Sequence, residues 1–507
     1  MTKRLLAVGG VLLLLAAPVA GVEWGWAQVQ AEVGARATVG GTTWSPLQRS
    51  MEHVERPGVA IDRVLWDPRT PYALTLVGVT VDASQMQGGD GGEGIRGGPD
   101  VALHIEDAQL AWGDAVLLTG LSGSFEQGLR SADGGWLGPG RAAGFTMEPP
   151  VDWIRGAATV DVDARDGLSV ALSGTFTVDH PRLSTRAVQL PPLQAEMEGT
   201  LERLEGQATL GDLSLDVRVE DPVLSVTLAP SDARQVLGIV EDVIPELKDA
   251  ELRGTLGGSA SWNRETDAWT LEPHLEGLAV QGAVPNLEQL RWGRFSYRAW
   301  DTDGQPIVRA SGEGTSDWTS LRDVSEHLPA AIVAAEDSAF YRHKGYDPNA
   351  IQAAIASNQE AGSVVRGGST LTQQLAKNLF LSGERTLERK LRELLLAVEL
   401  DRALGKERVM ELYVNVVEWG PEIWGVQQAS DTYFARRPAT LPPNEAAFLA
   451  AILPSPRTFY TDWYLRGRAG SFKMDWVLTN MADGKHFSHQ RADGEKARPL
   501  RFVPPPK

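Results

Sequence analysis

The hydrophobic pattern of this 507-residue chain changes its period once, near residue 300. Before that point apolar and polar residues alternate, most clearly over residues 213–219 and again over 101–105, 168–172 and 295–299. Side chains that alternate in this way belong to strands with one buried face. Gly, Asp and Pro separate the alternating runs, as turn-forming residues do. We therefore expect residues 24–300 to form an antiparallel β-rich domain with long strands.

The second part of the chain carries the pattern of helices. After a polar, Gly-rich stretch at 301–317, which predicts a linker, helix-forming residues dominate. The leucines of residues 386–404 recur at helical spacing. We therefore expect an α-helical domain over residues 318–460. One helix is also expected inside the β-rich part, near residues 231–245, where four apolar residues share a helical face.

The N-terminus has the pattern of a membrane segment. Two basic residues precede an uncharged, largely apolar run over residues 5–22, and Trp24 and Trp26 follow where interfacial aromatic residues belong. Residues 1–23 are therefore predicted to be a single-pass signal anchor, and a cleaved signal peptide is the alternative. Either way, nearly all of the chain is expected to lie outside the cytoplasm.

Composition excludes several classes of function. The formal net charge is −18, which argues against a general nucleic-acid binder with a basic face. The chain has no Cys, so disulfides, thiolate metal sites and Cys nucleophiles are excluded.

Residues 336–345 (EDSAFYRHKG) form the first of five clusters of functional side chains. Glu336 ends a run of small apolar residues that predicts a helix packed into a core. A carboxylate in such a place has a raised pKa and exchanges protons near neutral pH. The alternative is a helix-end carboxylate paired with Arg342 or Lys344.

Residues 366–378 (RGGSTLTQQLAKN) form the second cluster. Paired glycines allow close approach to a ligand, and Ser369 and Thr370 sit where a helix N-cap would bind an anion. Lys377 follows about two turns later. The spacing is not that of a P-loop, and an ordinary helix cap is the alternative.

The third cluster lies on the leucine-striped helix at residues 389–393 (RKLRE). Arg389 and Glu393 are four residues apart, so a helical ion pair is one interpretation. In the other, the cations face an anionic leaving group and Glu393 faces the reacting centre. Residues 406–415 (KERVMELYVN) and 436–450 (RRPATLPPNEAAFLA) complete the set.

These five clusters, in this order between about residues 321 and 460, resemble the motifs of the family 51 peptidoglycan glycosyltransferases. Residues 418–420 (EWG) are most similar to the monofunctional members. The preceding β-rich part weakly resembles membrane-anchored periplasmic proteins of the AsmA type. The resemblance implies a multidomain protein: an N-terminal membrane anchor, an antiparallel β-rich domain, and an α-helical, lysozyme-like glycosyltransferase domain. It also implies a place in the inner membrane, with the bulk of the chain in the periplasm.

For mechanism, the resemblance implies polymerisation of lipid II into β-1,4 glycan strands, with inversion at the donor carbon and loss of undecaprenyl pyrophosphate. Glu336 is then the general base, and Glu393 orients the pyrophosphate or shares a divalent cation, Mg²⁺ or Mn²⁺, with it. No organic cofactor is expected. The implied substrate-binding residues are Lys377, Arg389, Lys390, Ser369, Thr370, Gln373, Gln374, Asn378, Asn415 and Arg366, and the implied bracing residues are Asp337, Phe340, His343 and Gly345.

Two other functions remain open at this point. A lytic enzyme that cleaves peptidoglycan also uses carboxylates, but it needs no cationic site for a pyrophosphate. A non-catalytic envelope scaffold or lipid-binding protein is the third possibility, and the β-rich domain is a candidate for docking cell-wall synthesis proteins. The 47 residues after Tyr460 contain no SxxK, SxN and KTG set, so transpeptidase activity is not expected. They end in three prolines and are predicted to form a largely extended C-terminal tail over 461–507.

Overall fold

The computed structural model describes residues 38–504, except 45–48, 57–58, 67–72, 83–101, 113–114, 126–140, 149–153, 164–167, 182, 200–202, 221, 264–265, 267, 362–366, 385 and 468–470. The predicted anchor, residues 1–23, and the predicted ligand residue Arg366 lie outside this part. Among the described residues, every helix is too short or too polar to span a bilayer. The chain forms two compact units. The first comprises Met1–Pro181, Thr185–Ser231 and Gly257–Glu272, and the second comprises Arg182–Ser184, Asp232–Leu256 and Pro273–Lys507.

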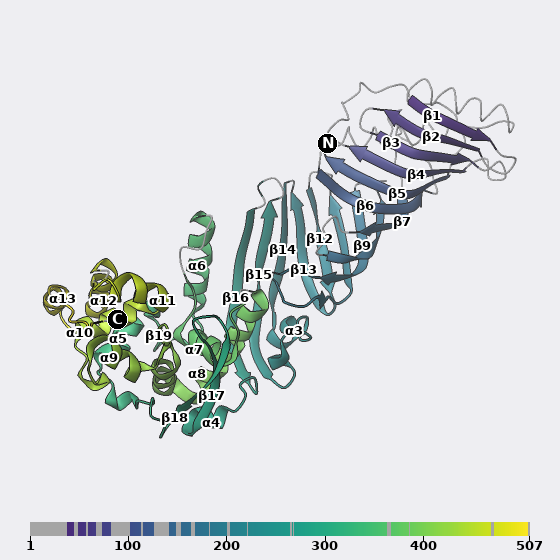
Figure 1. Cartoon of the computed structure of the whole chain (residues 1–507). Coiled ribbons are helices and arrows are strands. Elements are labelled where there is room, and N and C mark those ends of the chain that lie inside the picture. Colours follow the sequence, from purple (N-terminus) through teal and green to yellow (C-terminus); the bar gives the residue numbers. More distant parts are fainter. Residues whose placement is uncertain are drawn as a thin grey trace. The chain divides into compact units, whose positions relative to one another are not determined.

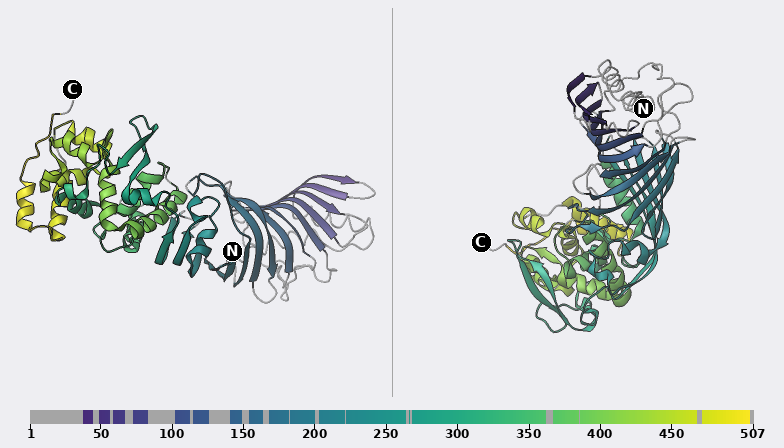
Figure 2. Two further views of the ribbon diagram at one scale, coloured as in Figure 1. Left: turned by 90° about the horizontal axis from the view of Figure 1, so that it is seen from below. Right: turned by 90° about the vertical axis from the view of Figure 1, so that its right-hand side faces the viewer.

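The first unit is built from strands that follow one another in chain order (Figure 1). The described strands are β1 (Thr38–Trp44), β2 (Arg49–Arg56), β3 (Val59–Trp66), β4 (Ala73–Asp82), β5 (Ala102–Trp112), β6 (Ala115–Phe125), β7 (Arg141–Glu148), β8 (Ile154–Asp163), β9 (Leu168–Val178), β10 (Val188–Gln189), β11 (Leu193–Gly199), β12 (Arg203–Leu210), β13 (Leu213–Glu220) and β14 (Val223–Asp232). The predicted β-rich region is therefore present, and Figure 2 shows its strands as one curved layer.

One strand pair differs from the antiparallel prediction. β4 and β5 are parallel, with Leu74 opposite Leu103, whereas the other described pairs of this unit are antiparallel. A parallel pair needs a connection of about a dozen residues or more, and residues 83–101 supply that length. The alternation of apolar residues could not reveal the difference, because it carries no strand direction.

The strand register separates apolar from polar side chains. Ala195 of β11 lies opposite Ala208 of β12, which lies opposite Leu215 of β13 and then Leu228 of β14. The intervening residues, such as Asp216, point to the other face. One face is thus aliphatic and the other charged, as the alternation predicts.

The second unit holds the helices. Its elements are α3 (Ala233–Gly238), η1 (Pro245–Leu247), α4 (Leu287–Trp292), β17 (Arg294–Trp300), β18 (Pro306–Gly312), η2 (Leu321–Asp323), α5 (His327–Glu336), α6 (Pro348–Ala361), α7 (Leu371–Phe380), α8 (Leu387–Val416), β19 (Glu418–Gly420), β20 (Ile423–Trp424), α9 (Val426–Phe434), η3 (Pro438–Thr440), α10 (Pro443–Ile452), α11 (Pro456–Phe459), η4 (Tyr460–Tyr464), α12 (Ser471–Asp483) and α13 (His489–Lys496). Strands β15 (Glu251–Asn263) and β16 (Ala268–Gln281) divide between the two units.

Three local predictions differ from the structure. The helix expected at 231–245 is only the short α3, capped by Asp232, because the chain turns after Gly238. The predicted linker 301–317 contains β18, which pairs with β17. Apolar residues stand on the exposed face of β18 (Val308 is 80% exposed), while Arg309 and Ser311 stand on the more buried face, so the strand lacks the usual alternation and was missed. The predicted extended tail forms α12 and α13.

The core of the second unit is the helix α10, whose ten residues are all buried. α5, α12 and α13 pack against it. On α12 the side chains of Val477, Leu478 and Met481 are at most 1% exposed. These residues recur at helical spacing, and this spacing is the signal for a helix that the polar composition of the tail obscured.

Candidate active site

Glu336 is the last residue of α5. The helix ends there because Asp337 leaves the helical conformation, at φ −158° and ψ 74°. The Glu336 carboxylate is half-buried, and Gln374 Nε2 of α7 donates a hydrogen bond to its Oε2 at 2.9 Å. Burial raises the pKa of Glu336, and Gln374, Lys473 and Lys377 partly offset that rise. The result is a carboxylate that accepts a proton more readily than an exposed one.

A second hydrogen bond fixes Gln374 itself. The hydroxyl of Tyr413 on α8 donates to Gln374 Oε1 at 2.8 Å, and the Tyr413 side chain is fully buried. Because the amide oxygen is occupied in this way, its nitrogen faces Glu336. Gln374 was predicted to bind substrate, and in the structure it orients the carboxylate.

The start of α7 is a capping box made by Thr370 and Gln373. Thr370 Oγ1 accepts from the Gln373 backbone N–H, while Gln373 Oε1 accepts from the Thr370 backbone N–H. Thr370 Oγ1 also donates to the carbonyl of Gly345 at 2.7 Å. Both side chains are at most 2% exposed. These two side chains, which were predicted to bind substrate, therefore stabilise the start of α7 in the structure.

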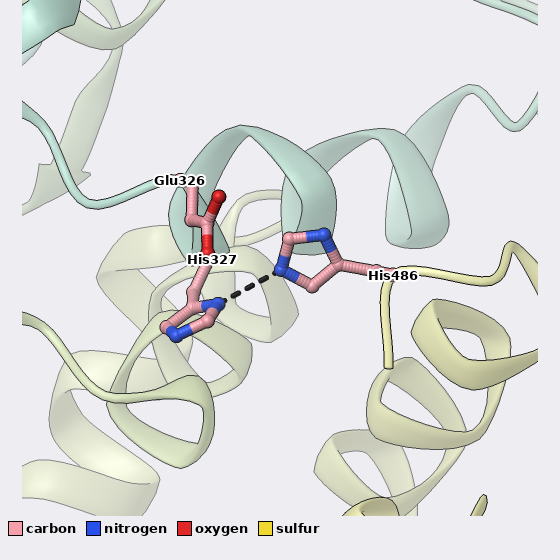
Figure 3. A group of neighbouring side chains, drawn as sticks. All are labelled: Glu326, His327 and His486. Carbon is pink, nitrogen blue, oxygen red and sulfur yellow. Dashed lines mark hydrogen bonds between the residues drawn. The ribbon is translucent and has the colours of Figure 1, made fainter. Parts of the chain in front are cut away.

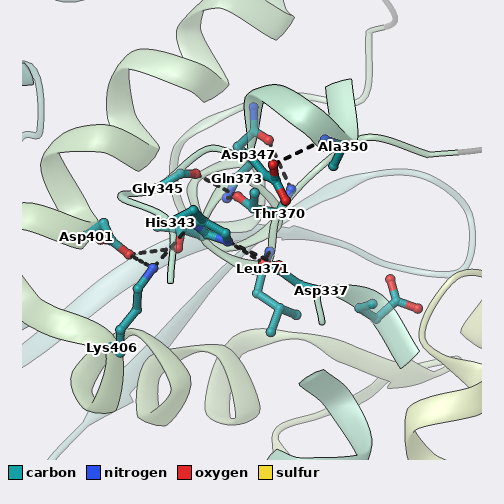
Figure 4. A network of polar contacts seen from close by, with 12 residues as sticks. Asp337, His343, Gly345, Asp347, Ala350, Thr370, Leu371, Gln373, Asp401 and Lys406 are labelled. Atoms are coloured by element: carbon teal, nitrogen blue, oxygen red, sulfur yellow. Dashed lines mark hydrogen bonds and ion pairs between the residues drawn. The ribbon is translucent and has the colours of Figure 1, made fainter. Parts of the chain in front are cut away.

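Asp337 joins α5 to α7 through a buried polar network (Figure 4). Its Oδ2 accepts from the Leu371 backbone N–H and from His343 Nε2, both at 2.9 Å. Lys406 Nζ lies 3.4 Å from His343 Nδ1 and pairs with Asp401. The imidazole thus has a donor beside Nδ1 and an acceptor beside Nε2, so both of its ring nitrogens are engaged.

Phe340 and Gly345 complete this network. Phe340 is fully buried, and the Lys406 ammonium lies 4.7 Å from the centre of its ring. Gly345 has φ +85°, and a Cβ there would lie 2.5 Å from the carbonyl oxygen of Ala397, so another residue would be strained and would clash. The four residues interpreted as bracing thus lie together around the first turn of α7.

A cluster of cations lies at the start of α8, which Thr386 caps. Lys390 Nζ donates to Glu393 Oε2 at 2.7 Å and to Ser369 Oγ at 2.5 Å. Arg389 forms an ion pair with Glu393, whose side chain is only 4% exposed. Burial and the neighbouring cations lower the pKa of Lys390 to about 8. The second and third clusters of the sequence thus meet at Ser369 and Lys390.

The Lys377 ammonium interacts electrostatically with both Glu336 and Arg389. Its side chain has solvent access, but surrounding protein partly desolvates the ammonium, and this together with Arg389 lowers its pKa while Glu336 raises it. Asn378, half-buried, follows it on α7.

Asn415, which was predicted to bind substrate, makes three hydrogen bonds to backbone groups in the structure. Its Oδ1 accepts from the Thr319 backbone N–H, and its Nδ2 donates to the carbonyls of Thr319 and Glu411, all at 2.8 Å. The residue is 3% exposed. Both amide protons and the oxygen are therefore engaged in fixing the segment that enters the helical region.

Sequence reasoning missed Lys473, which lies on α12 in the predicted tail. Burial lowers the pKa of Lys473, and the nearby Glu336 carboxylate partly offsets that lowering. Its ammonium also lies 4.9 Å from the centre of the Phe459 ring. No motif marks this residue, because only the packing of α12 on α5 brings it to the site.

Together these side chains provide one proton acceptor and a separate group of cations. A half-buried carboxylate can take a proton from a hydroxyl, and fixed cations can stabilise the negative charge of a departing group.

Comparison with known proteins identifies the same part of the chain. The family described as Transglycosylase matches residues 303–482. A biosynthetic peptidoglycan transglycosylase of Alcanivorax borkumensis is 42% identical over 219 residues, which are 41% of this chain and 89% of that protein. The protein of the same name from Thiobacillus denitrificans is 45% identical over 203 residues, covering 37% of this chain and 84% of that protein. Penicillin-binding protein 1A of Aquifex aeolicus is 42% identical over 183 residues, covering 36% of this chain and 25% of that protein.

Two of these relatives are matched over most of their length, 89% and 84%. The matched region contains the five motifs, and with them the carboxylate and the cations of the site. The chain belongs to the family of biosynthetic peptidoglycan transglycosylases, and it is a peptidoglycan glycosyltransferase.

Proposed function

We propose that this enzyme polymerises lipid II, with Glu336 as the general base. The Glu336 carboxylate takes the proton of the 4-hydroxyl of the incoming GlcNAc. That oxygen forms a bond to C1 of the MurNAc at the reducing end of the growing chain, and the bond from C1 to the undecaprenyl pyrophosphate breaks. The product is a β-1,4 linkage. The observation that carries this proposal is the half-buried Glu336, with a raised pKa and a hydrogen bond from Gln374.

The departing pyrophosphate is assigned to Lys377, Arg389 and Lys390, with Ser369 as a hydroxyl partner. A pyrophosphate gains negative charge as its bond to carbon breaks, so fixed cations stabilise the transition state more than the ground state. Ser369 already holds Lys390 at 2.5 Å, which keeps the ammonium in place without a ligand.

Glu393 is proposed to orient these cations. Its two oxygens contact Arg389 and Lys390, and it is not part of the one group of possible metal ligands found among the described residues. This arrangement does not fit a resident Mg²⁺ or Mn²⁺ ion, which prefers several oxygen ligands. We assign no step to such an ion, and a comparison of rates with and without EDTA tests whether one is required.

The test is polymerisation of labelled lipid II by detergent-solubilised protein, with moenomycin as the inhibited control. Glu336→Gln should abolish polymer formation, whereas Glu407→Gln, an exposed position on α8, should retain it. Polymer formed at the wild-type rate by Glu336→Gln would remove Glu336 from the role of base. Release of fragments from finished peptidoglycan, without polymer from lipid II, would point instead to a lytic enzyme.

We also propose that residues 1–23 anchor the protein in the inner membrane and that the bulk of the chain lies in the periplasm. The β-rich part, which resembles AsmA-type proteins, is proposed to dock cell-wall synthesis proteins, with lipid binding as the alternative. The aliphatic face of β11–β14 supports such a surface. Crosslinking of the full chain in cells, with Val217→Glu as the altered face, tests docking. Mass spectrometry of co-purified lipid tests the alternative.

A further inference from the structure

Three side chains that could bind a metal gather at the end of α5 opposite Glu336 (Figure 3). Glu326 precedes the helix, His327 is its first residue, and His486 lies between α12 and α13. One ligand atom from each lies within 4.8 Å of the others. Glu336 is nine positions after His327 on α5, about 13 Å along the helix axis, so this group is separate from the proposed base.

The two imidazoles face each other through ring nitrogens. His327 Nδ1 and His486 Nε2 are 2.8 Å apart, and the rings are nearly perpendicular, at 86°. In a tetrahedral zinc site with bonds of 2.0–2.1 Å, two nitrogen ligands lie about 3.3 Å apart. The two nitrogens would therefore have to move apart by about half an ångström to admit an ion. The imidazole that now donates would carry its proton on its other ring nitrogen instead.

The chemistry of the set suits a transition metal. Two imidazoles and one carboxylate are a known ligand set for Zn²⁺, with water completing the coordination. The chain has no Cys, so no thiolate competes for such an ion. The carboxylates of Glu326 and Glu495 and the guanidinium of Arg491 also lie near His327.

We propose that Glu326, His327 and His486 bind a divalent transition-metal ion of the Zn²⁺ type. The ion ties the connection between α12 and α13 to the start of α5. α12 also contacts the C-terminal end of α5, where Asn480 Nδ2 donates a hydrogen bond to the Ala334 carbonyl at 3.1 Å. The ion would thus hold the helix that carries Lys473 against the helix that ends in Glu336.

The test is Zn²⁺ binding by the full chain, purified without a His tag and stripped with EDTA. Isothermal titration calorimetry should give one ion per chain, and Co²⁺ should give the visible absorption of a tetrahedral site. His486→Ala and His327→Gln should each weaken binding at least tenfold. His489→Ala is the matched control, because this exposed histidine lies three residues from His486 and outside the group.

A second measurement separates loss of the ion from loss of the fold. Zn²⁺ should raise the Tm of the wild type and of His489→Ala, and should leave that of His486→Ala unchanged. Glu326→Gln, at an exposed position, should fold and bind more weakly. Wild-type protein that binds no ion, or His486→Ala that binds as the wild type does, would overturn the proposal and leave a hydrogen-bonded histidine pair. Because neither assay uses lipid II, a failure here is independent of the proposed polymerase activity.

Discussion

Replacing Gln374 with Leu removes the hydrogen bond that holds the Glu336 carboxylate in its charged form. The bond is 2.9 Å long and reaches a half-buried group, so it is of the charge-assisted kind that contributes about 1.5–3 kcal/mol. One pKa unit corresponds to about 1.4 kcal/mol. We therefore expect the pKa of Glu336, already raised by burial, to rise further, and kcat/KM on the acid limb to fall by about tenfold to a hundredfold.

The sign of the effect on activity follows from the role of Glu336. A general base works only when deprotonated, so activity is lost as pH falls through its pKa. Raising that pKa moves the acid limb of kcat/KM to higher pH and leaves the alkaline limb in place. The assay is kcat/KM for lipid II polymerisation from about pH 4 to pH 9, with wild type and Gln374→Leu compared at constant ionic strength.

Tyr413→Phe provides the matched comparison. In Gln374→Leu the buried Tyr413 hydroxyl loses its acceptor, at a cost to stability of about 1–3 kcal/mol. Adding Tyr413→Phe should recover stability without moving the acid limb back, because the amide that faces Glu336 is still missing. A folded Gln374→Leu enzyme with an unmoved acid limb would refute the reasoning, since either Gln374 does not stabilise the carboxylate or Glu336 does not set the limb.

Three further outcomes follow from neighbouring groups. Lys390, with its pKa lowered to about 8, should lose its charge and its hold on the pyrophosphate above that pH, and Lys390→Arg should move the alkaline limb of kcat/KM upward. The Glu399 carboxylate, 2% exposed, accepts hydrogen bonds from the backbone N–H groups of Val284 and Gly282 at 2.7 and 2.8 Å. Glu399→Gln should therefore lower the free energy of unfolding, measured in urea, by about 2–3 kcal/mol. The exposed control Glu407→Gln should leave it unchanged. Lys473→Met should raise the pKa of Glu336, seen as an acid limb that moves upward by less than in Gln374→Leu.

The structure brings residues of the first four predicted clusters together, since Glu336, Gln374 and Tyr413 are joined by hydrogen bonds and Lys390 contacts Ser369. The sequence could not assign a role to each polar residue. Gln373 and Gln374 are neighbours in one motif, yet successive helical side chains diverge by about 100°, so one caps α7 in the core and the other reaches Glu336. Nothing local distinguishes them. Asn415 likewise has the chemistry of a ligand residue, and only the position of Thr319 gives its amide backbone partners.

The β-rich part shows a similar limit. Alternation predicted strands and their two faces, since burial of one face requires it. It could not give the parallel pair of β4 and β5, because direction depends on the connection between strands and not on the pattern within them.

The helical domain was predicted to end at residue 460, and removing the residues after it would show whether the site depends on them. Motifs end there, but α12 packs on α5 and α10 with Val477, Leu478 and Met481 fully or almost fully buried. Each such side chain contributes about 1.5–3 kcal/mol when buried, so the three together are comparable with the whole stability of a typical domain, about 5–15 kcal/mol.

A chain that stops after Tyr460 would also lose Lys473. We therefore expect it to lack a cooperative unfolding transition of the helical region by circular dichroism and to make no polymer, whereas a chain that stops after residue 504 keeps both. A stable, active chain ending at Tyr460 would contradict this, and would mean that α5 needs no support from α12 to present Glu336.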